Sequence, residues 1–322
     1  MTLISENEIE IAADCLRNGG LVAFPTETVY GLGANALNPL AVAGIFDAKK
    51  RPNFDPLIVH IAEIEQIEQL YSHPINPGVY LLAAKFWPGP LTIVHKKSDL
   101  VPELVTSDLD AVGVRMPSHP IAQQLIKLAG VPVAAPSANR FGQLSPTSYK
   151  HVEKQKMEID YIIQNRDNYE SVGIESTVVS IENNTCIVLR PGVITAEDIQ
   201  NVLVDFEVIT PEKNIKLVSP GLLKSHYSPL KPLYYYSEEN ELPKNSGLIL
   251  HKKEANKTYT CKTVFTSETE NLLEVAANLF SVLHKMEEDD EVTQIYIAKT
   301  TNTGIGRAIM DRLNKATYQY RS

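Results

Sequence analysis

The chain has 322 residues, which is more than one hydrophobic core usually organises, so we expect two domains. Hydrophobic residues make up 43% of the chain and charged residues 21%, a balance that excludes disordered, collagen-like and fibrous proteins. No apolar run approaches the roughly 18 residues that would span a bilayer. The N-terminus lacks the basic start and apolar stretch of a signal peptide, so we expect a cytoplasmic protein that does not bind membranes.

The charge balance narrows the possible partners. Asp and Glu outnumber Lys and Arg by 39 to 30, which gives a formal net charge of −9. A protein this acidic has no general attraction for nucleic acid, so strong direct nucleic-acid binding is not expected. The three cysteines, Cys15, Cys186 and Cys261, have no metal-binding spacing, and we interpret them as buried thiols.

The first two hundred residues alternate helices with short apolar strands. Helix-start signals occur at Ser5, Asn38, His119 and Thr195. Apolar runs predict strands at 21–24, 57–61, 91–95, 112–115, 131–135, 161–164, 177–181 and 186–189. These runs are continuous rather than alternating, so we expect a sheet that is covered on both faces.

A second unit follows a change of composition. Residues 207–232 are rich in Lys, Pro and Ser and are interpreted as a linker between a domain of residues 1–206 and a smaller one of residues 233–322. The smaller domain is predicted to hold strands at 233–236, 247–250, 263–265 and 294–298, a helix capped by Ser267 and Glu270, and a final helix at 307–315. This alternation indicates a small Rossmann-like α/β domain.

Polar and glycine-rich clusters follow several of the predicted strands. The segment PTETVYGLG (25–33) comes directly after the first one, and either forms an ordinary turn or binds a ligand at the strand end. Lys49, Lys50 and Arg51 precede another strand and predict an anion site. His60 lies inside that strand, where a core role and a functional role are both open. Gly304 and Gly306 form only a weak nucleotide-binding signal.

The remaining strand ends repeat this pattern. Arg115, Ser137 and Asn139 follow strands, and so do the segments GIEST (173–177) and RPG (190–192). These strand-end segments contain many hydrogen-bond donors and few free carboxylates, and no nucleophilic triad is apparent in them. This combination is typical of phosphoryl or nucleotidyl transfer, which works through positioning and charge neutralisation.

Together these motifs resemble the threonylcarbamoyl-adenylate synthase family in its two-domain form. The resemblance runs in order through PTETVYGLG, AKKRP, DPLIVHI, FWPGPLT, VGVRMPSHP, APSAN, GIESTVV, RPG and SPGLLKSHYSP, and includes the C-terminal GIGRAIMDRL. It implies a YrdC-like twisted mixed sheet with helices around a concave basic cavity, followed by the small C-terminal domain.

The resemblance also implies a reaction. L-Threonine, bicarbonate and ATP, with Mg²⁺, would give threonylcarbamoyl-AMP and pyrophosphate. The product would pass to the machinery that transfers the threonylcarbamoyl group to tRNA. The rival hypothesis is a YrdC-like module that binds double-stranded RNA or tRNA without catalysis, and a second rival is carbamoylation of a different amino acid.

Site residues follow by position in the family motifs. The catalytic, phosphate-contacting elements are Lys49, Arg51, Ser137 and Asn139. The further ATP contacts are Asp55, Ser145, Arg190 and Tyr227. The threonine contacts are Thr28, His60, Arg115, Ser176 and Thr177.

Two residues depart from the family pattern, and one segment carries an additional expectation. Asp55 stands where the family often has Asn, and could oppose phosphate or help to hold a metal. Ala111 stands where the family often has Thr, so that any contact there is through the backbone or is lost. Residues 219–229 are expected to fold over the ATP cavity as a lid, with Tyr227 against the nucleotide.

Overall fold

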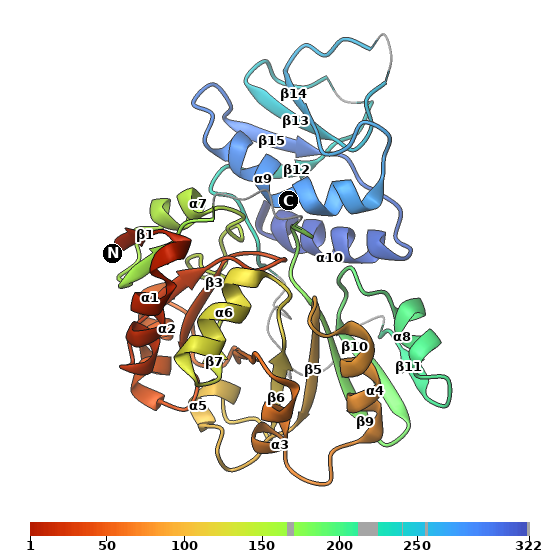
Figure 1. The fold of residues 1–322 in the computed structure, drawn as a ribbon. Helices are drawn as coiled ribbons and strands as arrows, with labels where there is room; N and C mark the ends of the chain where they lie inside the picture. Colours follow the sequence, from red (N-terminus) through yellow and green to blue (C-terminus); the bar gives the residue numbers. More distant parts are fainter. Residues whose placement is uncertain (166–170, 212–224, 240, 255–256, 321–322) are drawn as a thin grey trace.

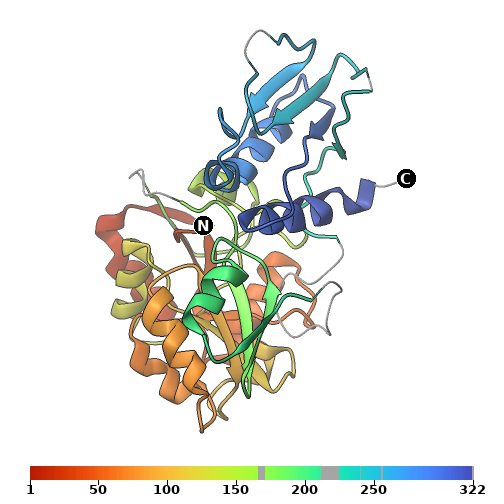
Figure 2. The same ribbon diagram turned by 90° about the vertical axis from the view of Figure 1, so that its right-hand side faces the viewer.

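A computed structural model describes residues 1–165, 171–211, 225–239, 241–254 and 257–320, which form two α/β domains (Figures 1 and 2). The larger domain is built on an 11-stranded mixed sheet and the smaller one on a 4-stranded sheet. Among the helices of these ranges, none has both the length and the apolar character needed to cross a membrane.

The large sheet contains every strand predicted for the N-terminal domain and three more. Its strands are β1 (Thr2–Ile4), β2 (Val22–Phe24), β3 (Gly31–Asn35), β4 (Ile58–His60), β5 (Leu91–Lys96), β6 (Ala111–Arg115), β7 (Val133–Ala134), β8 (Tyr161–Ile163), β9 (Thr177–Glu182), β10 (Thr185–Arg190) and β11 (Glu207–Ile209). Their order across the sheet is β1-β8-β2-β3-β7-β4-β6-β5-β9-β10-β11. The additional strands are β1, β3 and β11.

Strand β11 lies in the first residues of the segment that was predicted to be the linker. It pairs in parallel with β10, with Glu207 opposite Thr185 and Ile209 opposite Ile187. Only Val208, its middle residue, packs on the core, so this short edge strand has little apolar signal in its sequence. The large sheet therefore extends three residues into the segment that the sequence analysis interpreted as linker.

The helices of the larger domain are α1 (Ile9–Arg17), α2 (Pro39–Lys49), α3 (Ile67–Leu70), α4 (Pro77–Phe86), α5 (Glu103–Thr106), α6 (Pro120–Ala129), α7 (Tyr149–Lys154) and α8 (Ala196–Val202). Three of them, α2, α6 and α8, begin at predicted signals, and α1 follows a fourth. Asn38 accepts hydrogen bonds from the first amides of α2, and the imidazole of His119 accepts one from the start of α6. Gly130 ends α6 in the left-handed conformation. Ser5 and Glu8 form the expected capping box, but on a 3₁₀ turn that leads into α1.

Helices cover both faces of the sheet, as the continuous apolar strands predict. On one face, Val22 and Phe24 of β2 pack in one apolar cluster with residues of α1 and α6. On the other, Ala23 belongs to a larger cluster with residues of α2 and α4. Successive side chains of a strand point to opposite faces of the sheet. A strand that is buried on both faces is therefore apolar at successive positions rather than at alternate ones.

The smaller domain has a fully parallel sheet. Its elements are β12 (Leu233–Tyr235), β13 (Ser246–Leu250), β14 (Lys262–Phe265), β15 (Gln294–Ile297), α9 (Leu272–Glu287) and α10 (Ile305–Thr317), with strand order β12-β15-β13-β14. The predicted cap of α9 was wrong. Asn271 caps it, whereas Ser267 bonds to Glu274 and Glu270 has a left-handed backbone.

The two domains share an apolar core. Both α9 and α10 lie on the side of the small sheet that faces the larger domain (Figures 1 and 2). Leu279 and Phe280 of α9 belong to one buried cluster with Val29 and Ile174 of the larger domain and with Tyr227. The smaller domain is therefore packed against the segments that, as shown next, line a pocket.

Candidate active site

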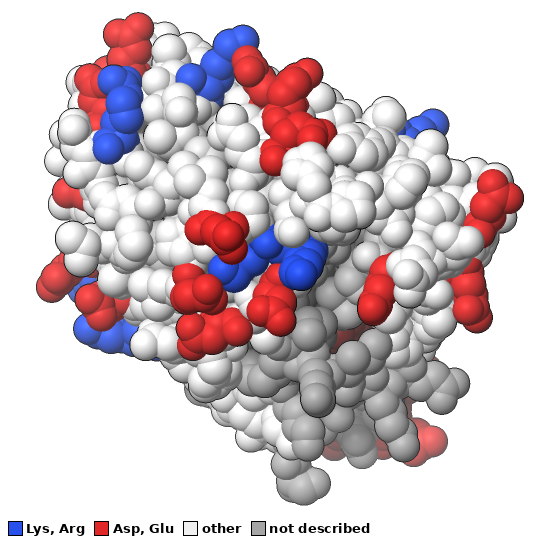
Figure 3. Space-filling view, turned by 90° about the horizontal axis from the view of Figure 1, so that it is seen from below, with Lys and Arg blue, Asp and Glu red and all other residues white. Residues whose placement is uncertain are grey.

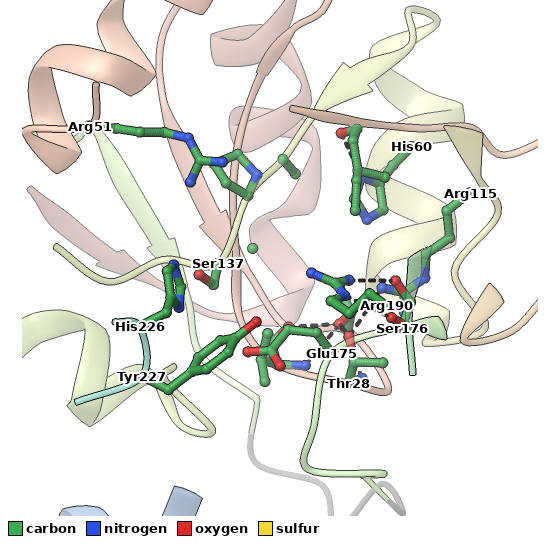
Figure 4. A pocket seen from close by; sticks show the side chains of 16 residues that line it. Thr28, Arg51, His60, Arg115, Ser137, Glu175, Ser176, Arg190, His226 and Tyr227 are labelled. Atoms are coloured by element: carbon green, nitrogen blue, oxygen red, sulfur yellow. Dashed lines mark hydrogen bonds between the residues drawn. The ribbon is translucent and has the colours of Figure 1, made fainter. Parts of the chain in front are cut away.

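A pocket opens in the larger domain where several strand ends meet (Figure 4). Its empty volume is about 580 Å³, part of it open to solvent. The residues that the sequence predicts for the site and that line the pocket are Thr28, Arg51, His60, Arg115, Ser137, Ser176, Arg190 and Tyr227. An acidic protein thus gathers three guanidinium groups around one cavity, which suits an anionic ligand.

One side of the pocket is organised around Arg115 at the end of β6. Its Nη1 donates to Thr28 Oγ1 over 3.1 Å and its Nη2 pairs with Glu27 Oε1 over 2.5 Å. Thr26 Oγ1 lies 2.8 Å from Thr28 Oγ1 and accepts from the amides of Thr28 and Val29, which fixes the loop after β2. The loop is therefore a built polar wall rather than an ordinary turn.

His60 faces the same side of the pocket from the end of β4. Burial, together with the nearby positive charge of Arg115, lowers the pKa of His60 to about 3. Its Nδ1 lies 3.3 Å from the carbonyl oxygen of Ile58, and its ring meets Phe24 edge-on. At neutral pH this imidazole is uncharged and serves as a hydrogen-bonding group.

Ser176 and Arg190 form a connected pair, although the resemblance assigned them to different ligands. Arg190 donates from Nε to the carbonyl oxygen of Ser176 and from Nη2 to its Oγ, each over 3.1 Å. Thr92 Oγ1 lies 2.8 Å from the same Oγ. Burial is the main cause that lowers the pKa of Arg190. The structure places both predicted contacts on one wall.

The opposite side is organised around Arg51, which follows the end of α2. Arg51 Nη2 pairs with Asp55 Oδ2 over 2.8 Å, and its Nε donates to the Asp55 carbonyl over 3.0 Å. Lys49 does not line the pocket. Its Nζ donates to the carbonyl oxygens of Ser137 and Asn139, each over 2.5 Å. Burial and the charge of Arg51 lower the pKa of Lys49 well below its usual value.

Five predicted residues lie behind the pocket wall: Lys49, Asp55, Asn139, Ser145 and Thr177. Asn139 donates to the carbonyls of Arg140 and Gln143 and so shapes the loop that carries Ser137. Thr177 Oγ1 donates to the carbonyl of Ile194, away from the cavity. Ala111 begins β6 and packs with Val94 and its neighbours, also outside the cavity. The structure thus presents these residues as supports of the wall.

Sequence reasoning did not assign roles to four residues of this region. Thr26, Glu175 and His226 line the pocket, and Glu27 pairs with Arg115 directly behind it. Each lies within two positions of a residue that was predicted for the site, so the motifs themselves contained the signal. The missing information was which neighbour faces the cavity, since that depends on loop geometry.

His226 and Tyr227 close one side of the pocket (Figure 4). Burial and then the charge of Arg51 hold the pKa of His226 well below its usual value. Ser228 donates to the carbonyl of Gly142, which ties the segment to the larger domain. Of the predicted lid, residues 219–224 lie outside the described residues, and residues 225–229 contact the cavity wall and α10.

A second group of ligand-type side chains lies between the domains. His151, His284 and Glu288 bring ligand atoms within 4.8 Å of one another. However, the two imidazole rings stack with centroids 3.8 Å apart, so their in-plane lone pairs do not converge on one point. Lys154 pairs with Glu288 and supplies the local positive charge. We interpret this group as a contact between the domains.

The comparisons with known proteins agree along the whole chain. Residues 14–192 match the family model named for Sua5, YciO and YrdC, whose description is telomere recombination. Residues 194–317 match the model described as threonylcarbamoyl-AMP synthase, C-terminal domain. The chain is 41% identical to threonylcarbamoyl-AMP synthase of Pyrococcus abyssi over 98% of its own length and 95% of the relative's.

Two further relatives extend this likeness. Threonylcarbamoyl-AMP synthase of Bacillus subtilis is 39% identical over 97% of this chain and 94% of the relative. The crystal structure of P. abyssi Sua5 complexed with L-threonine superposes with a TM-score of 0.87 at 38% identity, and covers 99% of this chain and 98% of that one. The expected two-domain architecture and fold are confirmed.

Proposed function

We propose that this chain, which belongs to the Sua5/YrdC family of threonylcarbamoyl-AMP synthases, condenses L-threonine, bicarbonate and ATP into threonylcarbamoyl-AMP and pyrophosphate. The observation that carries the proposal is the pocket itself. Arg51, Arg115 and Arg190 turn toward one buried cavity in a protein with a net charge of −9. Buried guanidinium groups are costly unless they meet fixed partners or an anionic ligand.

The Arg115 side is proposed to hold L-threonine. The planar guanidinium of Arg115 suits two parallel hydrogen bonds to a carboxylate, and Thr28 and Ser176 add hydroxyl groups at the same wall. His60, uncharged at neutral pH, can accept or donate one hydrogen bond without repelling an amine. Thr177 faces away from the cavity, so its part would be to position Ser176.

The Arg51 side is proposed to hold the ATP phosphates. Arg51 and Ser137 line it directly, while Lys49 and Asn139 fix the loop on which Ser137 lies. Preorganised donors of this kind stabilise the charge that develops during phosphoryl transfer without reorganising. Arg190 and Tyr227 would complete the nucleotide side, with Ser145 in support.

The residues fit a Mg²⁺ ion that arrives with ATP. Every carboxylate of this region pairs with an arginine: Glu27 with Arg115, Asp55 with Arg51, and Glu175 with Arg312. These carboxylates are therefore not free to form a metal site of their own. Mg²⁺ commonly binds through substrate phosphates and water instead. Bound in this way, the ion would neutralise part of the phosphate charge. Asp55, buried against Arg51, then sets the position of that arginine.

The chemistry requires a cavity that excludes water. The amine of threonine and bicarbonate give a carbamate and water, and a carbamate oxygen then attacks the α-phosphorus of ATP and displaces pyrophosphate. A carbamate decomposes in water, so a buried site protects it. No protein nucleophile is needed, which agrees with the absence of a catalytic triad from the sequence.

The product is proposed to supply tRNA modification in the cytoplasm. Its mixed anhydride can transfer the threonylcarbamoyl group to an adenosine, a step that we assign to a separate transferase machinery. The net charge of −9 gives the chain no general attraction for RNA. On the face shown in Figure 3, the described Lys and Arg are interspersed with Asp and Glu rather than joined in a basic surface. This weakens the alternative of an RNA-binding module.

One assay tests the proposal. Pyrophosphate release is measured with all three substrates and with each omitted in turn, and the nucleotide product is identified by mass spectrometry. We expect release only when threonine, bicarbonate and ATP are present together. Release that does not require threonine or bicarbonate would reject the proposal, and RNA binding without release would favour the module. The same assay across other amino acids measures the selectivity of the Arg115 side.

A further inference from the structure

One arginine of the smaller domain reaches the wall of the pocket. Arg312 lies on α10, and none of its surface is exposed. Its Nε donates to Glu175 Oε2 over 2.9 Å, its Nη2 to the Glu175 carbonyl over 3.3 Å and its Nη1 to the Pro191 carbonyl over 2.7 Å. The Arg312 guanidinium group is planar and donates to several fixed acceptors, so it holds the segment before β9 in one position relative to α10.

Glu175 lies between this arginine and the cavity. It lines the pocket (Figure 4), and its second oxygen, Oε1, accepts from Ser145 Oγ over 2.5 Å. Both carboxylate oxygens are therefore held, and Arg312 supplies the positive charge that pairs with Glu175. Arg312 also pairs with Asp311 Oδ2 over 2.9 Å, and Lys315 balances that second carboxylate. Without Arg312, an uncompensated carboxylate would stand in the wall of a cavity that is proposed to receive phosphates, where like charges repel.

Tyr227 is held by the same guanidinium. The Cζ atom of Arg312 lies 5.5 Å from the centre of the Tyr227 ring, within the range of a cation–π contact. Phe280 of α9 packs on this ring at 5.6 Å between centroids. Tyr227 has a φ of 59°, a conformation that costs free energy for a bulky residue and persists only where its surroundings fix it.

We infer that Arg312 is a positioning residue through which the smaller domain completes the nucleotide side of the pocket. It holds Glu175 and Tyr227 in the wall and cancels the carboxylate charge next to the phosphates. The inference rests on the proposed function for the identity of the ligand as ATP. It gives the C-terminal domain a part in substrate binding, although the pocket itself is lined by residues of the larger domain and by His226 and Tyr227.

The test compares Arg312→Lys with a matched control on the same helix. Arg307 also forms an ion pair across the domains, with Glu197 Oε1 at 3.3 Å, but this pair is open to solvent, with side chains 36% and 58% exposed. Lysine keeps the positive charge of Arg312 but lacks the planar guanidinium group with its several donors. We therefore expect ATP to bind about 10-fold to 100-fold more weakly in calorimetry. Arg307→Lys should stay within about 2-fold of the unmodified chain, because exposed pairs contribute little.

Three further readouts separate positioning from a loss of folding. The KM for threonine should rise by less than the Kd for ATP in Arg312→Lys, since Arg312 hydrogen-bonds to Glu175, Pro191 and Asp311, none of which is proposed to hold threonine. Arg312→Ala should bind ATP poorly and regain part of its affinity when methylguanidinium is added. Circular dichroism should show that both variants remain folded.

The outcomes distinguish this inference from the proposed function. If the unmodified chain makes no threonylcarbamoyl-AMP, but ATP binding still depends on Arg312, the proposed function is wrong and the positioning role stands. If the unmodified chain makes the product, and Arg312→Lys and Arg312→Ala bind ATP as it does, the inference is overturned. Equal losses of threonine and ATP binding in both variants would also overturn it.

Discussion

Charged residues lie near the strand ends of both sheets, and those that line the pocket of the larger domain are buried. Arg51, Arg115 and Arg190 are 7%, 4% and 4% exposed. After the strands of the smaller sheet, Lys257 pairs with Glu238 at 2.7 Å on the surface, and Lys299 lies over the ring of Tyr235 at 4.8 Å. Solvent screens such surface contacts, so they need no ligand to be tolerated.

This difference in the burial of charged side chains indicates which strand ends form a ligand-binding site. A buried guanidinium is retained only where fixed partners offset the cost of removing it from water. His251 of the smaller domain is buried too, but Thr266 and the carbonyl of Ala298 satisfy its two ring nitrogens at 2.7 and 2.8 Å. Burial alone therefore does not mark a site; buried charges that line an accessible cavity do.

The largest expected effect is at the Arg51 side. Lys49→Ala and Arg51→Ala should each lower the rate of adenylation by about 10²–10³-fold, the usual effect of losing one preorganised donor. Arg51 would act on the phosphates and Lys49 through the loop of Ser137. Single-turnover rates with all three substrates measure this. The control is Lys257→Ala at the other sheet, which should leave the rate unchanged; wild-type rates in both pocket variants would reject the assignment.

The next effect concerns the Arg115 side. Arg115→Lys should raise the KM for threonine by about 10-fold or more, because a point charge cannot replace a bidentate fork. ATP binding should be nearly unchanged. Steady-state kinetics with each substrate varied in turn give the two values. If the affinity for threonine holds while that for ATP collapses, Arg115 belongs to the nucleotide side instead.

A smaller effect is expected at Tyr227. Tyr227→Ala should lower synthesis by about 10-fold and let ATP be cleaved without forming product, because the wall that excludes water loses its aromatic face. Parallel measurements of pyrophosphate and threonylcarbamoyl-AMP give the coupling ratio. Tyr80, a tyrosine that is 39% exposed and donates to Glu68, provides the control variant Tyr80→Ala. A coupling ratio of one in Tyr227→Ala would exclude this role.

The last expected effect is on stability in acid rather than on activity. Burial lowers the pKa of His60 and of His151 to about 3 and that of His284 to about 4. Below a pH of about 6.5, the unfolded chain takes up protons that the folded chain does not, so the free energy of unfolding falls by up to about 1.4 kcal/mol per pH unit for each such group. This stability is complete above pH 6.5 and is lost as the pH falls.

Urea unfolding at pH 7, 6 and 5 measures that loss. His151→Gln, at the domain contact, should reduce the slope by about one proton. A stability that stays constant or rises between pH 7 and 5 would contradict the buried neutral state of these histidines.

The sequence predicted the local features and missed the long-range contacts. Asn38 and His119 begin helices as predicted, because a cap depends only on residues two or three positions away. Glu27 and Arg115 are 88 positions apart, and Glu175 and Arg312 are 137 apart, so no local pattern joins them. Lys49 shows the same limit, since a lysine in a motif carries no sign of whether it faces the ligand or the loop behind it.

Hydrogen exchange with and without ATP and threonine tests the central comparison most directly. If the buried charges of the larger domain bind the substrates, protection should rise in segments 25–33, 51–60, 136–145 and 174–177, which contain most of the residues that line the pocket. The strand ends of the smaller sheet, at 251–254 and 298–304, should exchange at the same rate in both states. Protection confined to those two segments would contradict the account and move the ligand site to the smaller domain.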